Sequence, residues 1–134
     1  MNAEKLEILI QTDRGLVKPG EVVRGGFRIL TEAPMPVERI ELSVVWSTSG
    51  RGDTDEEVLH HETLAQGETV TADRAFPFQV QLPDQPWSYN GQLIKIGWSV
   101  RVRVYPVHGK PWGGAEPFRV HPAGWEKGAG GEPA

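Results

Sequence analysis

The amino-acid sequence predicts an all-β protein, a two-sheet antiparallel β-sandwich of about seven strands. The clearest observation is a period of two over residues 94–104, where every second residue is apolar and the residues between are polar or glycine. Glycine (16) and proline (11) together form about a fifth of the 134 residues and fall between apolar runs, as in turns that join strands. No apolar pattern with helical spacing persists for three turns, which argues against helices.

Each predicted strand is an apolar run bounded by turn residues. The seven runs are residues 5–12, 21–30, 37–49, 58–64, 70–81, 92–105 and 115–121. Pro19-Gly20 predicts a type II turn that starts the second strand, because proline presets φ and glycine accepts a positive φ. Asn90-Gly91 is a favoured tight-turn pair before the long sixth strand. The polar segment between the third and fourth strands is expected to be a solvated, acidic hairpin loop.

Alternation also predicts which side chains face inward. The expected core residues are Leu6, Ile8, Ile10, Val23, Gly25, Phe27, Ile29, Ile40, Leu42, Val44, Trp46, Phe76, Phe78, Val80, Leu82, Ile94, Ile96, Trp98, Val100, Val102, Val104, Phe118 and Val120. The polar residues between them face water, as expected for antiparallel sheets with one solvated side. One shared core can hold the whole set.

Length and composition define one domain, residues 1–121, followed by a flexible tail of residues 122–134 that is rich in Gly, Pro and Ala. Trp125 is the exception within this tail, because an isolated Trp docks on the body of the protein or contacts another molecule. We favour docking on the body.

Composition also excludes several classes of function. The chain has no cysteine, which rules out disulfides, thiolate metal sites and a Cys nucleophile and fits a reducing compartment. Its net charge of −4 argues against a general nucleic-acid binder. Charged residues interrupt the N-terminal segment, and no apolar run is long enough to span a membrane, so we expect a cytoplasmic protein without a signal peptide. No cofactor is expected.

Two segments resemble the arrestin-type β-sandwich, which is immunoglobulin-like in architecture. Residues 18–46 open on Lys18-Pro19-Gly20-Glu21, and residues 82–104 carry a Leu-Pro pair, a short loop with Ser88-Tyr89 and Gly91, and a long strand. The resemblance implies a binding or adaptor domain without chemistry of its own. Arrestins carry two such sandwiches and this chain has one, so their phosphate-sensing and hinge residues are not carried over. A small microbial arrestin-like protein is the better match.

Six residues are candidates for partner binding. Lys95, Arg101 and Arg103 project from the outer face of the long strand, where they form a docking stripe for an acidic partner or an ordinary solvated face. Arg24 and Arg28 would join this stripe if their strand were its neighbour. The loop residues are Trp87, Tyr89 and Trp112. Exposed aromatic residues commonly anchor contacts, although they can equally cap the end of a sandwich.

Other motifs carry little weight. Arg51-Gly52-Asp53 matches an adhesion tripeptide, but we expect no secretion. The acidic cluster that follows lacks the glycine of a calcium loop. His60 and His61 point to opposite faces of a strand, so they do not share a metal, and we expect no metal site. No catalytic motif is present, and we expect no enzyme.

Two functions from different classes remain open. The first is a non-enzymatic interaction or adaptor module that binds another protein, or a second copy of itself, through a sheet edge or its loops. The alternative is a carbohydrate-recognition sandwich in which Trp87 and Trp112 form an aromatic platform.

Overall fold

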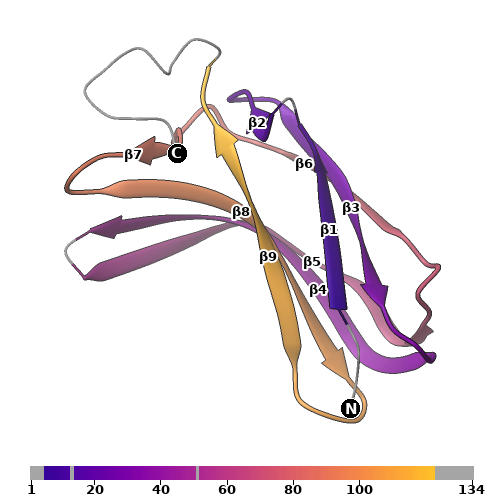
Figure 1. The fold of residues 1–134 in the computed structure, drawn as a ribbon. Helices are drawn as coiled ribbons and strands as arrows, with labels where there is room; N and C mark the ends of the chain where they lie inside the picture. Colours follow the sequence, from indigo (N-terminus) through magenta and orange to yellow (C-terminus); the bar gives the residue numbers. More distant parts are fainter. Residues whose placement is uncertain (1–4, 13, 51, 123–134) are drawn as a thin grey trace.

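The computed structural model describes residues 5–12, 14–50 and 52–122, and within these residues the chain is an all-β sandwich of two sheets (Figure 1). The fold class expected from the sequence is therefore confirmed. The described residues form nine strands: β1 (Lys5–Gln11), β2 (Leu16–Val17), β3 (Val22–Leu30), β4 (Met35–Gly50), β5 (Asp53–Val70), β6 (Phe76–Gln81), β7 (Tyr89–Asn90), β8 (Lys95–Pro106) and β9 (Trp112–Val120).

The smaller sheet has the order β1-β3-β6, and the larger has the order β2-β9-β8-β4-β5, with β7 paired to the start of β8. All neighbouring pairs are antiparallel except β2 and β9, which run parallel over two residues of each strand. Neither two-residue strand is predicted from the sequence, since two residues show no periodicity. β2 has a structural role, because it carries the chain from the small sheet to the large one directly after β1.

The core lies between the two sheets, and alternation predicted its members well. Trp98 is 2% exposed and packs between Trp46 and Phe118, with ring centroids 6.4 and 6.0 Å away. Phe27 and Phe76 stack at 4.9 Å. Ile94 departs from the prediction, because its side chain is 44% exposed at the turn before β8.

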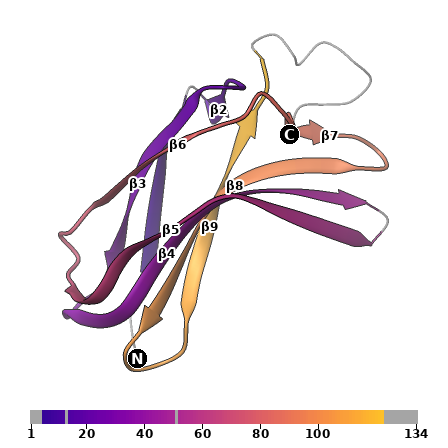
Figure 2. The same ribbon diagram turned by 180° about the vertical axis from the view of Figure 1, so that it is seen from behind.

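The prediction of an acidic hairpin loop between the third and fourth strands is wrong. β4 and β5 continue to a tight turn at Gly52, whose φ is +88°. Asp55 and Glu56 pair with Thr48 and Ser47 as ordinary ladder residues. Figures 1 and 2 show this ribbon extending beyond the three-stranded sheet. Because no second sheet covers it there, both of its faces can be polar, and its strands lack the apolar alternation that sequence analysis detects.

Two other expectations have clear outcomes, and a third lies outside the described residues. Gly20 has a φ of +79°, and Glu21 N donates to Lys18 O at 3.1 Å, so the expected turn is confirmed. Val70 ends β5 and does not begin the next strand, because it pairs with Met35. Arg51, Trp125 and the rest of residues 123–134 lie outside the described residues, so the tail stays a prediction. Among the described residues no helix is long and apolar enough to cross a membrane.

Candidate functional site

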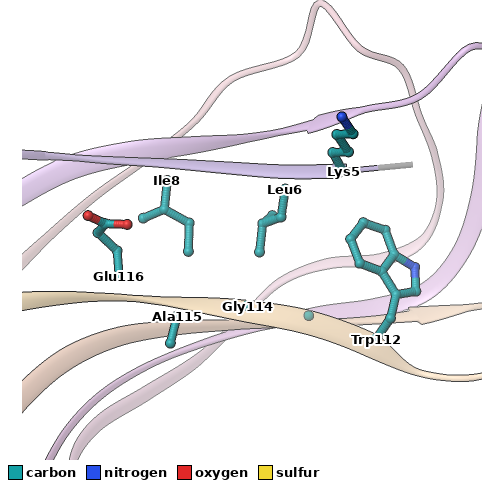
Figure 3. Close-up of a pocket in the computed structure, with 8 residues that line it drawn as sticks. Lys5, Leu6, Ile8, Trp112, Gly114, Ala115 and Glu116 are labelled. Carbon is teal, nitrogen blue, oxygen red and sulfur yellow. The ribbon is translucent and has the colours of Figure 1, made fainter. Parts of the chain in front are cut away.

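The open side of the sandwich, where β1 of the small sheet lies beside β9 of the large sheet, contains a groove of about 410 Å³. Figure 3 shows Leu6 and Ile8 pointing from β1 toward β9, while Trp112 and Glu116 point from β9 toward β1. Leu6, Ile8 and Trp112 are half-buried against the core. Glu116 lies at one end of the groove, whereas the side chain of Lys5 points away from β9 (Figure 3), so the groove is apolar along its length and acidic at one end.

Both strands beside this groove are edges. β1 pairs only with β3, and β9 has β8 on one side and the short β2 on the other. Because β2 reaches only Arg119 and Val120, residues 112–118 of β9 have no strand partner on that side within the described chain. Pro117 fits this position, since proline within sheets is confined largely to edges.

Glycine shapes the floor of the groove. A Cβ on Gly114 would lie 3.3 Å from Leu6 Cδ2, so the missing side chain leaves room for β1 to approach β9. Alternation predicts Leu6 and Ile8 as core residues, and the groove was not expected from the sequence. The signal was present in Gly113 and Gly114 beside Trp112, which is an unusual sequence for an ordinary covered strand.

A second cavity, of about 300 Å³, lies at the other end of the molecule where β7 pairs with β8. It is lined by Gln85, Pro86, Trp87, Ser88, Tyr89 and Ile96. Two indole groups fix the loop that forms it: Trp87 Nε1 donates to Asp84 O at 2.8 Å, and Trp98 Nε1 donates to Pro86 O at 3.0 Å. We call this cavity the aromatic pocket.

The structure brings Trp87 and Tyr89 together and places Trp112 elsewhere. Tyr89 pairs with Ile96 near the start of β8, whereas Trp112 pairs with Val104 near its end. Eight residues of β8 separate these positions, which corresponds to roughly 26 Å of extended strand. The aromatic platform expected from Trp87 and Trp112 together is therefore not formed.

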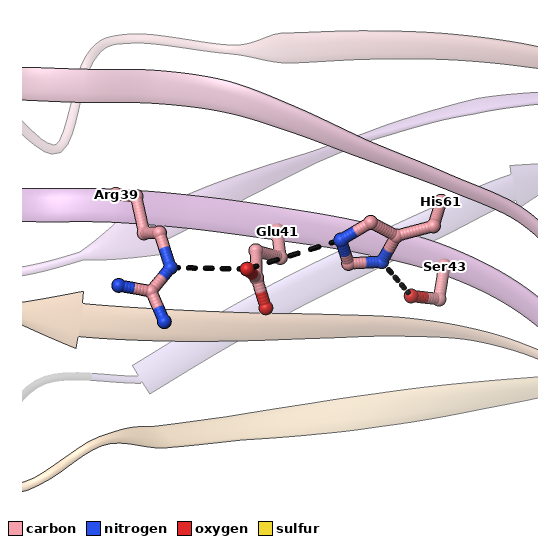
Figure 4. Close-up of polar contacts among 4 residues, drawn as sticks. All are labelled: Arg39, Glu41, Ser43 and His61. Atoms are coloured by element: carbon pink, nitrogen blue, oxygen red, sulfur yellow. Dashed lines mark hydrogen bonds and ion pairs between the residues drawn. The ribbon is translucent and has the colours of Figure 1, made fainter.

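The outer face of the large sheet carries a row of polar contacts across β4 and β5 (Figure 4). Arg39 Nε donates to Glu41 Oε2 at 3.0 Å, and Glu41 Oε2 lies 3.8 Å from His61 Nε2. His61 Nδ1 shares a hydrogen bond of 2.9 Å with Ser43 Oγ. Partial burial raises the pKa of Glu41, but hydrogen bonds from Arg39 and Tyr105 and the charges of Arg39 and His61 outweigh it, so its pKa lies below the usual value.

The expected cationic stripe is partly neutralised. Arg101 forms an ion pair with Glu56 of β5. The Arg103 guanidinium lies 5.8 Å from the centre of the Tyr105 ring, which Arg39 also covers at 3.7 Å. Lys95 is exposed at the far end of the same face, six residues from Arg101 and so about 20 Å away.

Arg24 and Arg28 do not join the stripe. They belong to β3, which lies in the other sheet, so the condition for their proximity is not met. Arg28 forms an ion pair with Glu7 of β1 at 2.8 Å.

The two histidines behave as their position in a strand predicts. His60 Nε2 lies 3.1 Å from Glu62 Oε1 on one face of β5. His61 lies on the opposite face, where it shares a hydrogen bond with Ser43. Within the described residues no group of three His, Cys, Asp or Glu side chains could hold a metal ion.

Comparison with known proteins identifies the fold. No protein-family model matches the sequence, and no curated protein matches it significantly. Among solved structures, the sporulation control protein Spo0M from Bacillus subtilis is similar, with a TM-score of 0.67 at 17% sequence identity. The chain has an arrestin-like fold. The match covers 93% of this chain and 52% of Spo0M, so the chain spans about half the length of that protein. At 17% sequence identity, the similarity between this chain and Spo0M concerns the fold alone.

Proposed function

We propose that this protein is a non-enzymatic interaction module that binds an extended segment of another protein in the groove between β1 and β9. The observation that carries the proposal is the open edge of β9, residues 112–118, beside the apolar side chains of Leu6, Ile8 and Trp112. An exposed strand edge presents unpaired backbone N–H and C=O groups, and an incoming peptide can pair with them as an added strand.

The groove also suggests what kind of segment it accepts. Alternate side chains of an added strand would face inward onto Leu6, Ile8 and Trp112, so they should be apolar. Glu116 at one end of the groove favours a basic residue in the bound segment, because complementary charges fix the direction of a bound strand. The expected partner is an extended segment with alternating apolar residues and a basic residue at one end.

The arrestin-like fold supports a role in regulation without catalysis, as does the resemblance of residues 18–46 and 82–104 to that family. Spo0M is described as a sporulation control protein, and a control function for the present chain is part of the proposal.

Selection from a random peptide library tests the site. We expect the wild-type protein to enrich sequences with alternating apolar residues, and Gly114→Val to bind the selected peptides at least about tenfold more weakly, because the new side chain fills the groove against Leu6. Gly97→Val is the matched control, since a Cβ at Gly97 meets nothing within 4 Å and lies on the outer face of β8. Urea denaturation verifies that both variants remain folded.

Two outcomes would contradict the proposal. Selected peptides that bind the wild type and Gly114→Val equally well would show that they occupy another surface. Failure to enrich any peptide, together with dimerisation in analytical ultracentrifugation that Gly114→Val abolishes, would make a second copy of this chain the occupant of the groove.

A further inference from the structure

We propose that the aromatic pocket is a docking site for the chain's own C-terminal segment, with Trp125 as the side chain that fills it. Three observations support this assignment: where the described chain ends, what the pocket is made of, and which buried polar groups surround it. The proposal is independent of the peptide groove, which lies at the other end of β8.

The position of the chain end makes the contact short. Ser88, a residue of the pocket, binds the end of β9 twice: its N donates to Val120 O at 2.7 Å, and its Oγ accepts from Val120 N at 2.9 Å. The last described residue, Pro122, follows two positions later. Trp125 is three residues beyond Pro122, a reach of about 10 Å for an extended chain, so it can enter the pocket without a long loop.

The composition of the pocket suits an indole. Pro86, Trp87, Tyr89 and Ile96 provide aromatic and aliphatic walls, and the volume of about 300 Å³ is at the small end of ligand cavities. Aromatic side chains stack on one another and contribute about 0.5–1.5 kcal/mol beyond the area that they bury. The other residues from 123 to 134 are Gly, Ala, Pro, Glu and Lys, so Trp125 is the single side chain of this segment with enough apolar surface to fill the pocket.

The polar groups at this end of the sandwich are also covered. Of the described residues, the two polar ones that are fully buried are Ser88 and His121, at 0% and 2% exposure. Both lie where residues 123–134 begin. Ser88 is satisfied by its two hydrogen bonds with Val120, whereas His121 Nε2 is buried without a hydrogen-bond partner among the described residues. A buried polar atom without a partner is costly, so both residues mark an end of the fold that is shielded from water.

Methyl NMR spectroscopy on the full-length chain tests the proposal, with Ile96 in the pocket and Ile8 in the groove as paired reporters. We expect nuclear Overhauser effects between the ring of Trp125 and the Ile96 methyl groups. Trp125→Ala should shift the Ile96 methyl signals and leave those of Ile8 unchanged, because an indole ring current acts only at short range. Trp112→Ala should do the reverse. Dispersed spectra of both variants show that the sandwich is intact.

Three results would overturn the proposal. The first is unchanged Ile96 methyl signals in Trp125→Ala without any Trp125 contact in the wild type. The second is an equal shift of the Ile8 and Ile96 methyl signals, which would indicate a global change of the fold. The third is a Trp125–Ile96 contact that arises only between differently labelled copies in a mixed sample. This result would show that Trp125 of one molecule docks on a second molecule.

Discussion

Ser88 and Val120 hold each other through two hydrogen bonds, one from Ser88 N to Val120 O at 2.7 Å and one from Val120 N to Ser88 Oγ at 2.9 Å. They are 32 residues apart in sequence, and Ser88 is fully buried. This pair ties the loop after β6 to the end of β9. Because Ser88 lines the aromatic pocket, the pair joins one wall of that pocket to the end of β9.

Replacing Ser88 by alanine should destabilise the protein. The variant keeps the backbone bond but leaves Val120 N–H buried without its acceptor, which costs about 1–3 kcal/mol. Urea denaturation measures the free energy of unfolding, with Ser99→Ala on the more exposed outer face of β8 as the matched control. Equal stability of the two variants would show that water or another group satisfies Val120 N–H.

Gly25 should not tolerate a side chain. A Cβ at this position would lie 2.1 Å from Leu9 O and 2.7 Å from Phe78 Cζ, so β1 or Phe78 would have to move. We expect Gly25→Ala to lower the free energy of unfolding by about 1–3 kcal/mol. Gly97→Ala, where a Cβ meets nothing within 4 Å, should change it little. A stable Gly25→Ala variant would mean that β1 shifts readily on β3.

Glu41 should make stability depend on acid pH. The pKa of Glu41 is lowered in the folded protein, so the ionised carboxylate stabilises the fold at pH values above the usual carboxyl pKa of 4.5. This stabilisation is lost as the pH falls through the pKa that Glu41 has in the folded protein. Glu41→Gln should therefore be less stable than wild type near neutral pH, by at most about 1 kcal/mol, and equal to it in strong acid. Denaturation curves across this range provide the measurement.

The exposed Glu38 lies on the same strand and supplies the control, as Glu38→Gln. If that variant shows the same pH-dependent difference, the effect would come from net charge and not from the contacts of Glu41 with Arg39 and His61.

Neutralising the outer-face cation Arg101 should leave peptide binding unchanged. Arg101 is paired with Glu56 and lies on the outer face of β8, whereas the proposed groove is lined by side chains at the inner edge of the two sheets. Fluorescence anisotropy with a selected peptide should give the same Kd for wild type and Arg101→Gln. A several-fold loss of affinity would instead assign binding to the outer face and revive the stripe of Lys95, Arg101 and Arg103.

The sequence by itself determined the fold class and most of the core. Trp98, Val100, Val102 and Val104 alternate so regularly that burial on one face follows directly, and all four are buried. The positive φ of Gly20 followed from Pro19-Gly20 in the same way. These features are local, because neighbouring residues encode them by period or by turn chemistry.

Only the tertiary structure decided features that depend on distant residues. The ribbon of β4 and β5 escaped prediction because its uncovered end carries no apolar alternation, so the pairing of Thr48 with Asp55 could not be inferred. The separation of Trp112 from Trp87, and the meeting of Leu6 with Trp112 at the open side, depend on strand order. Strand order is set by the packing of the two sheets as a whole, and no local pattern in the sequence records it.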